Sequence, residues 1–360
     1  MEIKAHSKNY EVIFKENFDF IEKIAWIEQS LWVIDKNVFE LYEDIFNLYI
    51  DKDRLMLIEA TESNKIIETA LNICERMTLL QGKRNSTLIS VGGGITQDIT
   101  GFAANILYRG VQWIFIPTTL LAACDSCIGS KTSLNFKEYK NLLGTFYPPD
   151  ELYICLPFFK TLSEIDLLSG LGEVVKFNIM SGRDSLSLIE NDIVLLLQRD
   201  EQITKQYIHK SLEFKKTFIE ADEFDRGIRI KLNFAHTFGH AFETATNYAI
   251  PHGTAVAMGT IVASSISCSR GFISKETNKK IQSILLKIID IQLLKENNNL
   301  NIQDIYKFDS IMRAISKDKK QISSSLTAIL FENEKLGLAI FHDLNFDEIK
   351  SAIKELMNIL

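Results

Sequence analysis

The segment STLISVGGGITQD, residues 86–98, indicates the fold of the first half of this chain. Residues 86–94 have the pattern of a buried strand that ends in three glycines, and residues 98–107 continue with a helical pattern. Glycine permits close backbone approach, and a helix N-terminus offers unpaired N–H groups to a phosphate. The turn therefore suits a dinucleotide pyrophosphate near a helix that begins around Asp98. It lacks the GxGxxG spacing, so a plain tight turn between strand and helix explains it equally well.

The segments around this stretch extend the same pattern. Residues 30–35, 54–60 and 111–119 each indicate a further strand, and residues 64–80 have the 3.6-residue period of a helix. Strands separated by helices indicate parallel pairing, which needs crossover helices on the faces of the sheet. Residues 1–162 are therefore expected to form an open α/β, Rossmann-like nucleotide-binding domain.

The pattern changes after residue 162. Long helical segments are predicted at 164–180, 186–197, 201–221, 231–247 and 255–268, and the Asn-rich residues 297–301 indicate a loop. No internal repeat and no long low-complexity tract is present. Residues 163–360 are therefore expected to form a second, all-helical domain.

Composition narrows the class of protein. Of the 360 residues, 46% are hydrophobic and 24% charged, and the formal net charge is -7 with both signs mixed along the chain. Nucleic acid and membrane partners are not expected, because there is no basic block and no apolar run near the ~20 residues of a membrane helix. The N-terminus lacks a signal-peptide pattern, and the odd number of cysteines, five, fits reduced thiols. The expected location is the cytoplasm.

Three of the six histidines lie close together. His236 and His240 occur in HTFGH, four residues apart on one helix face, and His252 follows in PHG. Imidazole suits zinc, and a catalytic zinc site commonly has three protein ligands and one open position. No Glu follows His236, so the HExxH metalloprotease pattern is absent. Structural histidines remain the alternative explanation.

A buried carboxylate could supply another metal ligand. Glu173 and Lys176 occur in GEVVK, three residues apart on an apolar helix, where an unpaired charge is costly. Metal coordination would offset that cost. A common Glu–Lys pair on a helix surface is the alternative.

The segment ACDSCIGSK, residues 123–131, and Lys140-Asn141 behind it resemble an active-site loop, because polar side chains are scattered through an apolar, Gly-containing stretch. Cys124 and Cys127 form a CxxC. A structural zinc site would need a second such pair, and none exists, so small buried thiols are expected.

Taken together, these segments resemble one family, the sugar phosphate cyclases, which include the 3-dehydroquinate synthases. The resemblance covers roughly residues 35–320, and no single motif carries it. The matching segments, in the family's order and spacing, are GGG at 92–94 with Asp98, PTTLL at 117–121, residues 125–131, Lys140-Asn141, GEVVK at 172–176, LNFAHTFGH at 232–240 and His252-Gly253.

The resemblance implies a dehydroquinate synthase-like fold, with an N-terminal α/β NAD-binding domain, a C-terminal helical metal-binding domain and a homodimeric assembly. By position, the metal ligands are Glu173, His236 and His252, the metal is zinc or cobalt, and His240 serves the substrate. The implied NAD-binding residues are Asp35, Glu62, Lys65, Gly93, Gly94, Ile95, Asp98, Thr118, Thr119, Leu121, Lys140, Phe158 and Thr161.

The resemblance also implies the substrate contacts. Phosphate would meet Lys131, Asn141, Asn233, His240 and an Arg109 supplied by the other subunit; Asp125 and Lys176 would hold hydroxyls; and a carboxylate would meet Lys215, Arg229 and Lys319 or Lys320. In the family's reaction NAD oxidises a secondary alcohol, which acidifies the neighbouring C–H. Phosphate is then eliminated, the ketone is reduced again, the ring opens, and an aldol step closes a carbocycle. The basic set favours a small acidic sugar phosphate, 3-deoxy-arabino-heptulosonate 7-phosphate or a close analogue.

Some positions depart from the family pattern. Gln97, Ser130 and Ala235 stand where the family usually has Gly, Cys127 where it has Ser, Thr254 where it has Glu, and Asp225 where it has a Glu near the substrate. These departures suggest a divergent branch acting on another acidic sugar phosphate, in secondary or surface-polysaccharide metabolism. The sequence also leaves open a metal-dependent polyol dehydrogenase of the same fold and a non-enzymatic descendant.

Overall fold

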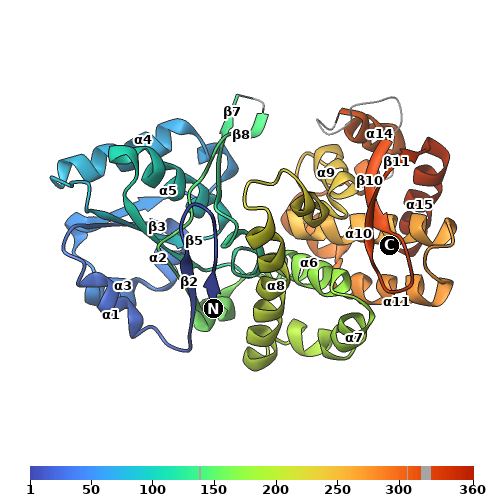
Figure 1. Cartoon of the computed structure of the whole chain (residues 1–360), viewed down its shortest axis with the longest axis horizontal. Coiled ribbons are helices and arrows are strands. Elements are labelled where there is room, and N and C mark those ends of the chain that lie inside the picture. The colour runs from blue at the N-terminus through green and yellow to red at the C-terminus, as the bar shows by residue number, and fades with distance from the viewer. Residues whose placement is uncertain (138, 306, 318–325) are drawn as a thin grey trace. The chain divides into compact units, whose positions relative to one another are not determined.

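The computed structural model describes residues 1–137, 139–305, 307–317 and 326–360, coloured along the chain in Figure 1. The chain divides into two compact units. The first comprises residues 1–162 together with 216–224, and the second comprises 163–215 together with 225–360. The long helix α8 (Glu201–Ala221) therefore begins in the second unit and ends in the first.

Within its described residues, the first unit is built on a seven-stranded sheet of order β1-β2-β9-β6-β5-β3-β4. Only β1 pairs antiparallel; the other neighbours are parallel, which confirms the expected α/β sheet. The strands are β1 (Glu2–Ile3), β2 (Tyr10–Lys15), β3 (Ser30–Asp35), β4 (Leu55–Ile58), β5 (Thr87–Gly92), β6 (Gln112–Pro117) and β9 (Glu151–Cys155).

Helices cover this sheet because its central strands are apolar along their whole length. Leu31, Trp32, Val33 and Ile34 of β3 are all fully buried, as expected for a parallel strand with both faces covered. The helices of the unit, shown in blue to green in Figure 1, are α1 (Phe20–Ala25), α2 (Lys36–Leu41), α3 (Glu43–Tyr49), α4 (Ile67–Leu79) and α5 (Gly94–Ile106).

Helix α5 begins earlier than the sequence pattern indicates. The expected start near Asp98 is wrong, because β5 ends at Gly92, Gly93 is the N-cap and Gly94 is already helical. Thr96 and Gln97 are buried although they are polar, so the apolar period does not reveal the first turn. Gly is tolerated at an N-cap, which lets the strand enter the helix directly.

The predicted loop around residues 123–131 is more ordered than expected. A π-helical turn, Ala122–Ser126, is followed by the antiparallel hairpin of β7 (Lys131–Phe136) and β8 (Tyr139–Phe146). The hairpin forms a two-stranded sheet of its own, labelled at the top of Figure 1. Lys131 is therefore the first residue of one strand, and Lys140 and Asn141 lie on the other.

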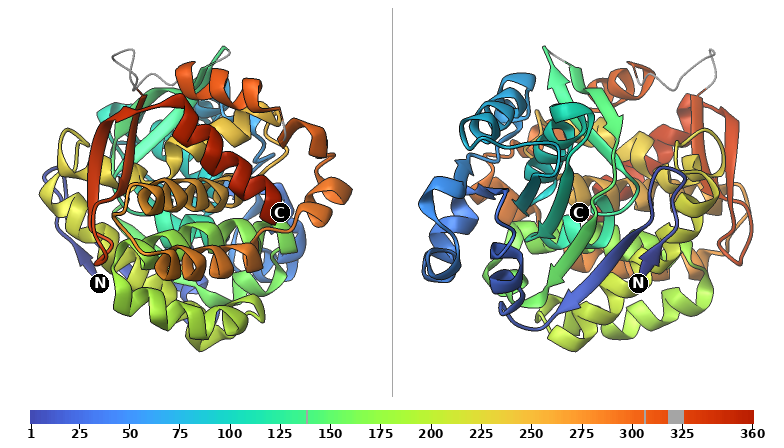
Figure 2. Two further views of the ribbon diagram at one scale, coloured as in Figure 1. Left: turned by 90° about the vertical axis from the view of Figure 1, so that its right-hand side faces the viewer. Right: turned by 60° about the vertical axis from the view of Figure 1, so that its left-hand side comes forward.

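The second unit packs around α10 (His252–Ser269), which is buried on nearly all sides. Its other helices are α6 (Glu164–Met180), α7 (Arg183–Leu197), α9 (His236–Ala245), α11 (Lys275–Leu285), α12 (Ile291–Asn297), α13 (Ile302–Ile305), α14 (Phe308–Lys317) and α15 (Phe346–Ile359). An antiparallel pair, β10 (Leu326–Phe331) with β11 (Leu338–Leu344), packs on α10 and is drawn in red-orange in Figure 2. The unit is helical as expected, but the all-helical description is wrong because of this hairpin.

A second correction concerns the helix expected at 231–247. The chain instead forms a 3-10 turn, Ile228–Asn233, and then α9, which starts at His236. Ala235 separates the two with a left-handed backbone, φ 69°. Glycine is the usual residue for this conformation, so an alanine here hides the break from sequence patterns.

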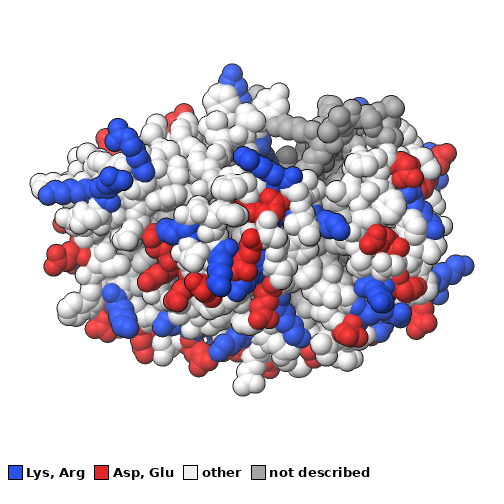
Figure 3. All heavy atoms as spheres, viewed as in Figure 1, with Lys and Arg blue, Asp and Glu red and all other residues white. Residues whose placement is uncertain are grey.

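The surface is mixed in charge. In the view of Figure 3, Lys and Arg side chains alternate with Asp and Glu side chains over the described residues. None of the helices in the described part of the chain is both long and apolar enough to span a membrane.

Candidate active site

The second unit brings Glu173, His236 and His252 together. Glu173 Oε1 lies 3.4 Å from His252 Nε2 and 3.6 Å from His236 Nε2, and one ligand atom from each residue lies within 4.8 Å of the others. The rings of His236 and His252 have centroids 5.3 Å apart. One carboxylate and two imidazoles are a ligand set of catalytic zinc sites.

Glycines allow the three helices to approach closely enough for this arrangement. Gly172 precedes Glu173, and Gly253 follows His252; a Cβ on Gly172 would collide with the Gly253 backbone, and a Cβ on Gly253 with the Ser169 backbone. Backbone contact of this kind requires residues without a side chain. The crossing of α6 and α10 thereby places the carboxylate of Glu173 beside the start of α10.

The Nδ1 nitrogens of His236 and His252 have partners that favour metal binding. His236 Nδ1 lies 3.0 Å from the Phe234 carbonyl oxygen, and His252 Nδ1 lies 3.5 Å from Glu243 Oε1. An Nδ1–H directed at an acceptor leaves Nε2 with its lone pair for a metal, as is usual around bound zinc. Glu173 is fully buried, and neither of its oxygens has a hydrogen bond of ordinary geometry to a described residue. The residues fit a divalent ion.

The position of His240 differs from that of the trio. It is half exposed, and its ring lies 5.2 Å from that of His236. It belongs to a second possible metal-binding group with Glu243 and His252, in which Glu243 Oε2 is 3.9 Å from His240 Nε2. Glu243 thus faces both histidines, one with each oxygen.

The charges around Glu173 set its protonation state. Burial alone would raise the pKa of Glu173, but Lys176 and His252 outweigh burial and lower the pKa to about 2. The pKa of His236 is lowered, first by burial and then by the neighbouring charges of Lys176, His240 and His252. A charged carboxylate and a neutral imidazole are the forms that bind a metal. Burial would lower the pKa of His252, but hydrogen bonds with Glu173 and Glu243 outweigh burial and raise it to about 10, so this ring must lose a proton when a metal binds.

Lys176 pairs with Glu173 in the interior. Its Nζ lies 2.5 Å from Glu173 Oε2 and donates to the Leu232 carbonyl oxygen at 3.3 Å, and both side chains are at most 1% exposed. The alternative of a surface pair on α6 is therefore wrong.

The residues expected to contact the substrate carboxylate, and Asn233, which is expected to contact its phosphate, also belong to the second unit. Arg229 and Lys215 are buried, 4% and 7% exposed, and Asn233 Nδ2 donates to the Ile230 carbonyl oxygen at 3.1 Å. Asp225 has a left-handed backbone, φ 56°, and precedes the 3-10 turn, so Asp225 and Arg229 do not lie on one α-helical face. Lys319 and Lys320 lie outside the described residues.

In the first unit, the expected NAD residues gather at the carboxyl edge of the sheet. Asp35 ends β3, Gly93 follows β5, Thr118 follows β6 and Phe158 follows β9. Ligands of open α/β sheets bind at this edge, where the strand order reverses; here the reversal lies between β3 and β5. Gly94 is the first residue of α5 at the same edge, and Ile95 is the second. A Cβ on Gly93 would lie 3.1 Å from the Thr119 side chain, and Leu121 follows Thr119 by two residues.

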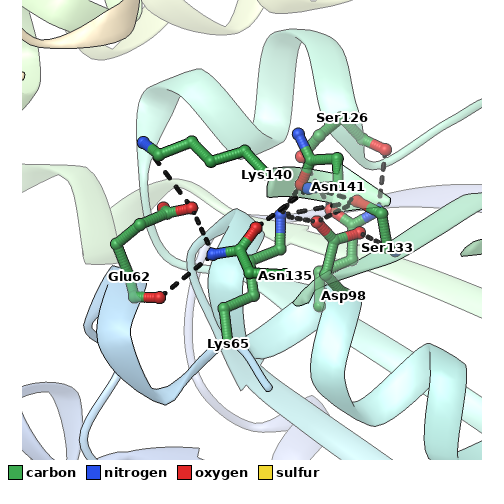
Figure 4. A network of polar contacts seen from close by, with 9 residues as sticks. Glu62, Lys65, Asp98, Ser126, Ser133, Asn135, Lys140 and Asn141 are labelled. Carbon is green, nitrogen blue, oxygen red and sulfur yellow. Dashed lines mark hydrogen bonds and ion pairs between the residues drawn. The ribbon is translucent and has the colours of Figure 1, made fainter. Parts of the chain in front are cut away.

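A polar network joins α5 to the hairpin (Figure 4). Lys65 Nζ lies 2.5 Å from Asp98 Oδ2 and donates to Asn141 Oδ1 at 2.6 Å. Burial raises the pKa of Asp98, while Lys65 and Ser133 act in the opposite direction. Lys140 Nζ lies 3.6 Å from Glu62 Oε1 in the same network.

Phe158 and the remaining expected residues of the first unit each have their own local contacts. Phe158 is buried against Tyr42, and Thr161 shares a hydrogen bond with the Tyr42 hydroxyl at 2.8 Å. Asp125 is half-buried in the π-helical turn, and Lys131 is exposed. Arg109 is exposed just beyond the far end of α5, about 20 Å along that helix from Gly94. The geometry therefore does not bring Arg109 to the glycine turn of its own chain.

Three departures from the family pattern have visible local effects. Gln97 turns inward and exchanges hydrogen bonds with Ser126, donating to its carbonyl at 2.8 Å and accepting from its hydroxyl at 2.7 Å. Cys124 and Cys127 are buried thiols, as expected. Ser130 has a left-handed φ of 65° and donates from its hydroxyl to Glu223 Oε1 at 2.8 Å.

Several of these residues were not expected from the sequence. Ser133 and Asn135 follow Lys131 on β7 at two-residue spacing. Side chains at this spacing lie on one face of a strand, so the sequence could have predicted that the three lie together. Glu243 follows His236 by seven residues and His240 by three, which could have placed it on the same helix face. Glu223 carries no such local signal.

The lowered pKa of Glu223 predicts that the unfolding free energy of the protein depends on pH. Burial would raise its pKa, but hydrogen bonds from Ser7 and Ser130 outweigh burial and lower the pKa. A lowered folded pKa stabilises the protein above the unfolded value near ~4.3, and this stabilisation is lost as the pH falls through the folded pKa. We expect Glu223→Gln to lose about 1–3 kcal/mol of unfolding free energy at pH 7, and less at pH 3.

Urea unfolding at both pH values measures this difference. Glu220→Gln is the matched control, since Glu220 accepts from the Lys4 backbone at 2.9 Å and pairs with Lys216 on a partly exposed helix face. Equal effects of the two substitutions at pH 7 would contradict the role of Glu223.

Comparison with known proteins shows which family this chain is similar to. Residues 55–169 match the family model "3-dehydroquinate synthase N-terminal", and residues 170–321 match "3-dehydroquinate synthase C-terminal". The 3-dehydroquinate synthase of Dictyoglomus thermophilum is 32% identical over 98% of this chain and 92% of its own length. That of Campylobacter fetus is 39% identical over 78% of this chain and 80% of its own.

A solved structure shares the fold. The structure of a 2-deoxy-scyllo-inosose synthase complexed with carbaglucose-6-phosphate, NAD+ and Co2+ has a TM-score of 0.82, 23% identity, and coverage of 99% of both chains. The family models together span more than half of the chain, and the relatives cover most of it. The chain therefore belongs to the 3-dehydroquinate synthase family of sugar phosphate cyclases.

Proposed function

We propose that this enzyme has 3-dehydroquinate synthase activity: it converts 3-deoxy-arabino-heptulosonate 7-phosphate into 3-dehydroquinate and releases phosphate. The observation that carries the proposal is the buried Glu173 carboxylate facing Nε2 of His236 and His252 in a chain of this family. When bound, NAD would take a hydride from a secondary alcohol and return it, and a zinc or cobalt ion would polarise the reacting oxygens.

Around the ion, the proposed roles follow from the side chains. Glu173, His236 and His252 hold it, and Glu243 orients His252 through Nδ1. Lys176, fixed by Glu173 and the Leu232 carbonyl, keeps an ammonium donor for a substrate hydroxyl without freedom to swing away. Asp125 is proposed to hold another hydroxyl.

The basic and hydrogen-bonding side chains of the site support an acidic sugar phosphate as the substrate. Lys131, Asn141, Asn233 and His240 are proposed to bind the phosphate, each as a hydrogen-bond donor. Arg229 and Lys215 are proposed to bind the carboxylate, and both cations are buried, which favours a binding role over a solvated one. A polyol dehydrogenase would have no use for either group.

The remaining assignments complete the proposal. NAD is expected in residues 1–162 on the set that gathers at the carboxyl edge of the sheet, and the metal in residues 163–360. A homodimer, in which Arg109 serves the other subunit, a cytoplasmic location and Asp225 near the substrate belong to the same proposal. So does the absence of nucleic acid and membrane partners.

The direct test is an incubation of the protein with NAD, a divalent metal and the heptulosonate phosphate. We expect equal amounts of inorganic phosphate and 3-dehydroquinate, measured by a phosphate assay and by chromatography. Phosphate release without dehydroquinate would also contradict the proposal, because the enzyme would then eliminate phosphate without closing the carbocycle. No phosphate release would contradict the proposal.

A further inference from the structure

Two carboxamides of the β7–β8 hairpin have orientations that their neighbours fix. Asn141 Oδ1 accepts from Lys65 Nζ at 2.6 Å and from Ser133 Oγ at 2.9 Å. A lysine ammonium can only donate, so the atom that faces it must be the amide oxygen. The Nδ2 amino group of Asn141 is therefore directed away from Lys65, and the side chain of Asn141 is exposed.

Asn135 is fixed in the same way by acceptors. Its Nδ2 donates to Glu62 Oε1 at 2.8 Å and to the Glu62 carbonyl oxygen at 3.1 Å. A carboxylate and a carbonyl can only accept, so Asn135 Oδ1 must point the other way, where it accepts the backbone N–H of Asn141 at 2.9 Å. Figure 4 shows Asn135 between Glu62 and Asn141.

The backbone of Asn141 is left-handed. Its φ is 52°, a conformation that is uncommon for residues other than glycine and that asparagine adopts more readily than most. Such conformations persist where the surroundings hold them, and they are concentrated at functional sites. Asn135 is itself anchored, because its backbone N–H donates to the Lys65 carbonyl oxygen at 2.7 Å.

We propose that Asn135 is a positioning residue for phosphate: it holds the Asn141 backbone in the left-handed conformation, so that Lys65 and Ser133 can fix the carboxamide with its N–H groups presented to the anion. The proposal rests on the proposed function, which assigns Asn141 to phosphate. It adds that Asn135 acts through Asn141 and does not itself touch the substrate.

A double-mutant cycle tests this without turnover. Inorganic phosphate is titrated by calorimetry into the enzyme saturated with NAD and zinc, for the wild type, Asn135→Ala, Asn141→Ala and the double variant. We expect Asn135→Ala to weaken phosphate binding about tenfold, the effect of one hydrogen bond to a charged group. In the Asn141→Ala background the same change should have no further effect.

A matched control lies on the same hairpin. Thr132 and Thr145 share a hydrogen bond across the strands at 2.6 Å, and this bond is separate from those that hold Asn135 and Asn141. Thr145→Val therefore perturbs the hairpin without touching the two carboxamides. We expect it to leave phosphate affinity unchanged while it lowers the thermal midpoint as much as Asn135→Ala does.

Three results would overturn the inference: wild-type phosphate affinity in Asn135→Ala, equal weakening by Asn135→Ala with and without Asn141, or no phosphate binding by the wild type. Failure of the proposed function is seen separately, as a wild-type enzyme that binds phosphate but forms no dehydroquinate.

Discussion

Glu173→Gln should remove the bound metal and lower kcat by about 10²–10³-fold, because polarisation by a metal ion contributes several kcal/mol to the barrier and each 1.4 kcal/mol is a factor of ten. Glutamine keeps the volume of the side chain but replaces the anion that faces both Nε2 atoms of His236 and His252. Metal content after dialysis, measured by mass spectrometry, and kcat at saturating metal check this expectation. A variant that retains one ion per chain would contradict it.

The same substitution should destabilise the metal-free protein. Lys176 is 1% exposed and would lose its carboxylate partner at 2.5 Å, and breaking a buried pair costs about 3–5 kcal/mol. Asp304→Asn is the control: Asp304 pairs with Lys307 at 2.6 Å with the same three-residue spacing, but on the surface, where such pairs contribute at most about 1 kcal/mol. Chemical unfolding of both metal-free variants gives the comparison.

Arg229→Leu should lower kcat/KM on the heptulosonate phosphate by about 2 kcal/mol or more, roughly 30-fold, since a hydrogen bond to a buried charged group contributes ~1.5–3 kcal/mol. The arginine is 4% exposed, which supports a binding role over a solvated one. Metal content and NAD affinity should be unchanged, because leucine removes only the charge assigned to the carboxylate.

Arg226→Leu is the matched control for this prediction. Arg226 lies three residues earlier and is exposed, so its replacement should change kcat/KM little. Full activity of Arg229→Leu, or equal losses in both variants, would defeat the carboxylate assignment and favour another branch of the cyclases.

Hydrophobic pattern predicts the elements that are apolar throughout or strongly periodic. The bounds of β3, α6 and α8 agree with the expected ranges. β3 and α6 are buried along most of their length, and α8 buries residues such as Tyr207, Ile208 and Leu212 at helical spacing. The start of α5 and the break before α9 escape prediction for a different reason. In α5 the polar residues Thr96 and Gln97 are buried, and before α9 the alanine Ala235 has a left-handed backbone. Tertiary contacts permit both features, and the local sequence pattern does not show them.

The metal-binding trio is more predictable than the network around Asn141. Histidine is rare in this chain, and His236 and His252 lie in one short segment. Glu173 is a charged residue on an otherwise apolar helix. By contrast, Ser133 and Asn135 are common polar residues whose partners, Lys65 and Glu62, lie 68 and 73 residues away in the chain. Only the fold brings them together.

In the proposed reaction NAD is a cofactor that is regenerated in each turnover. The most direct measurement supplies NAD at about one tenth of the concentration of the heptulosonate phosphate and follows absorbance of NADH and release of phosphate together. The cyclase account predicts complete conversion of the substrate with no net NADH at the end. Accumulation of NADH, with reaction stopping after one equivalent of NAD, would contradict it.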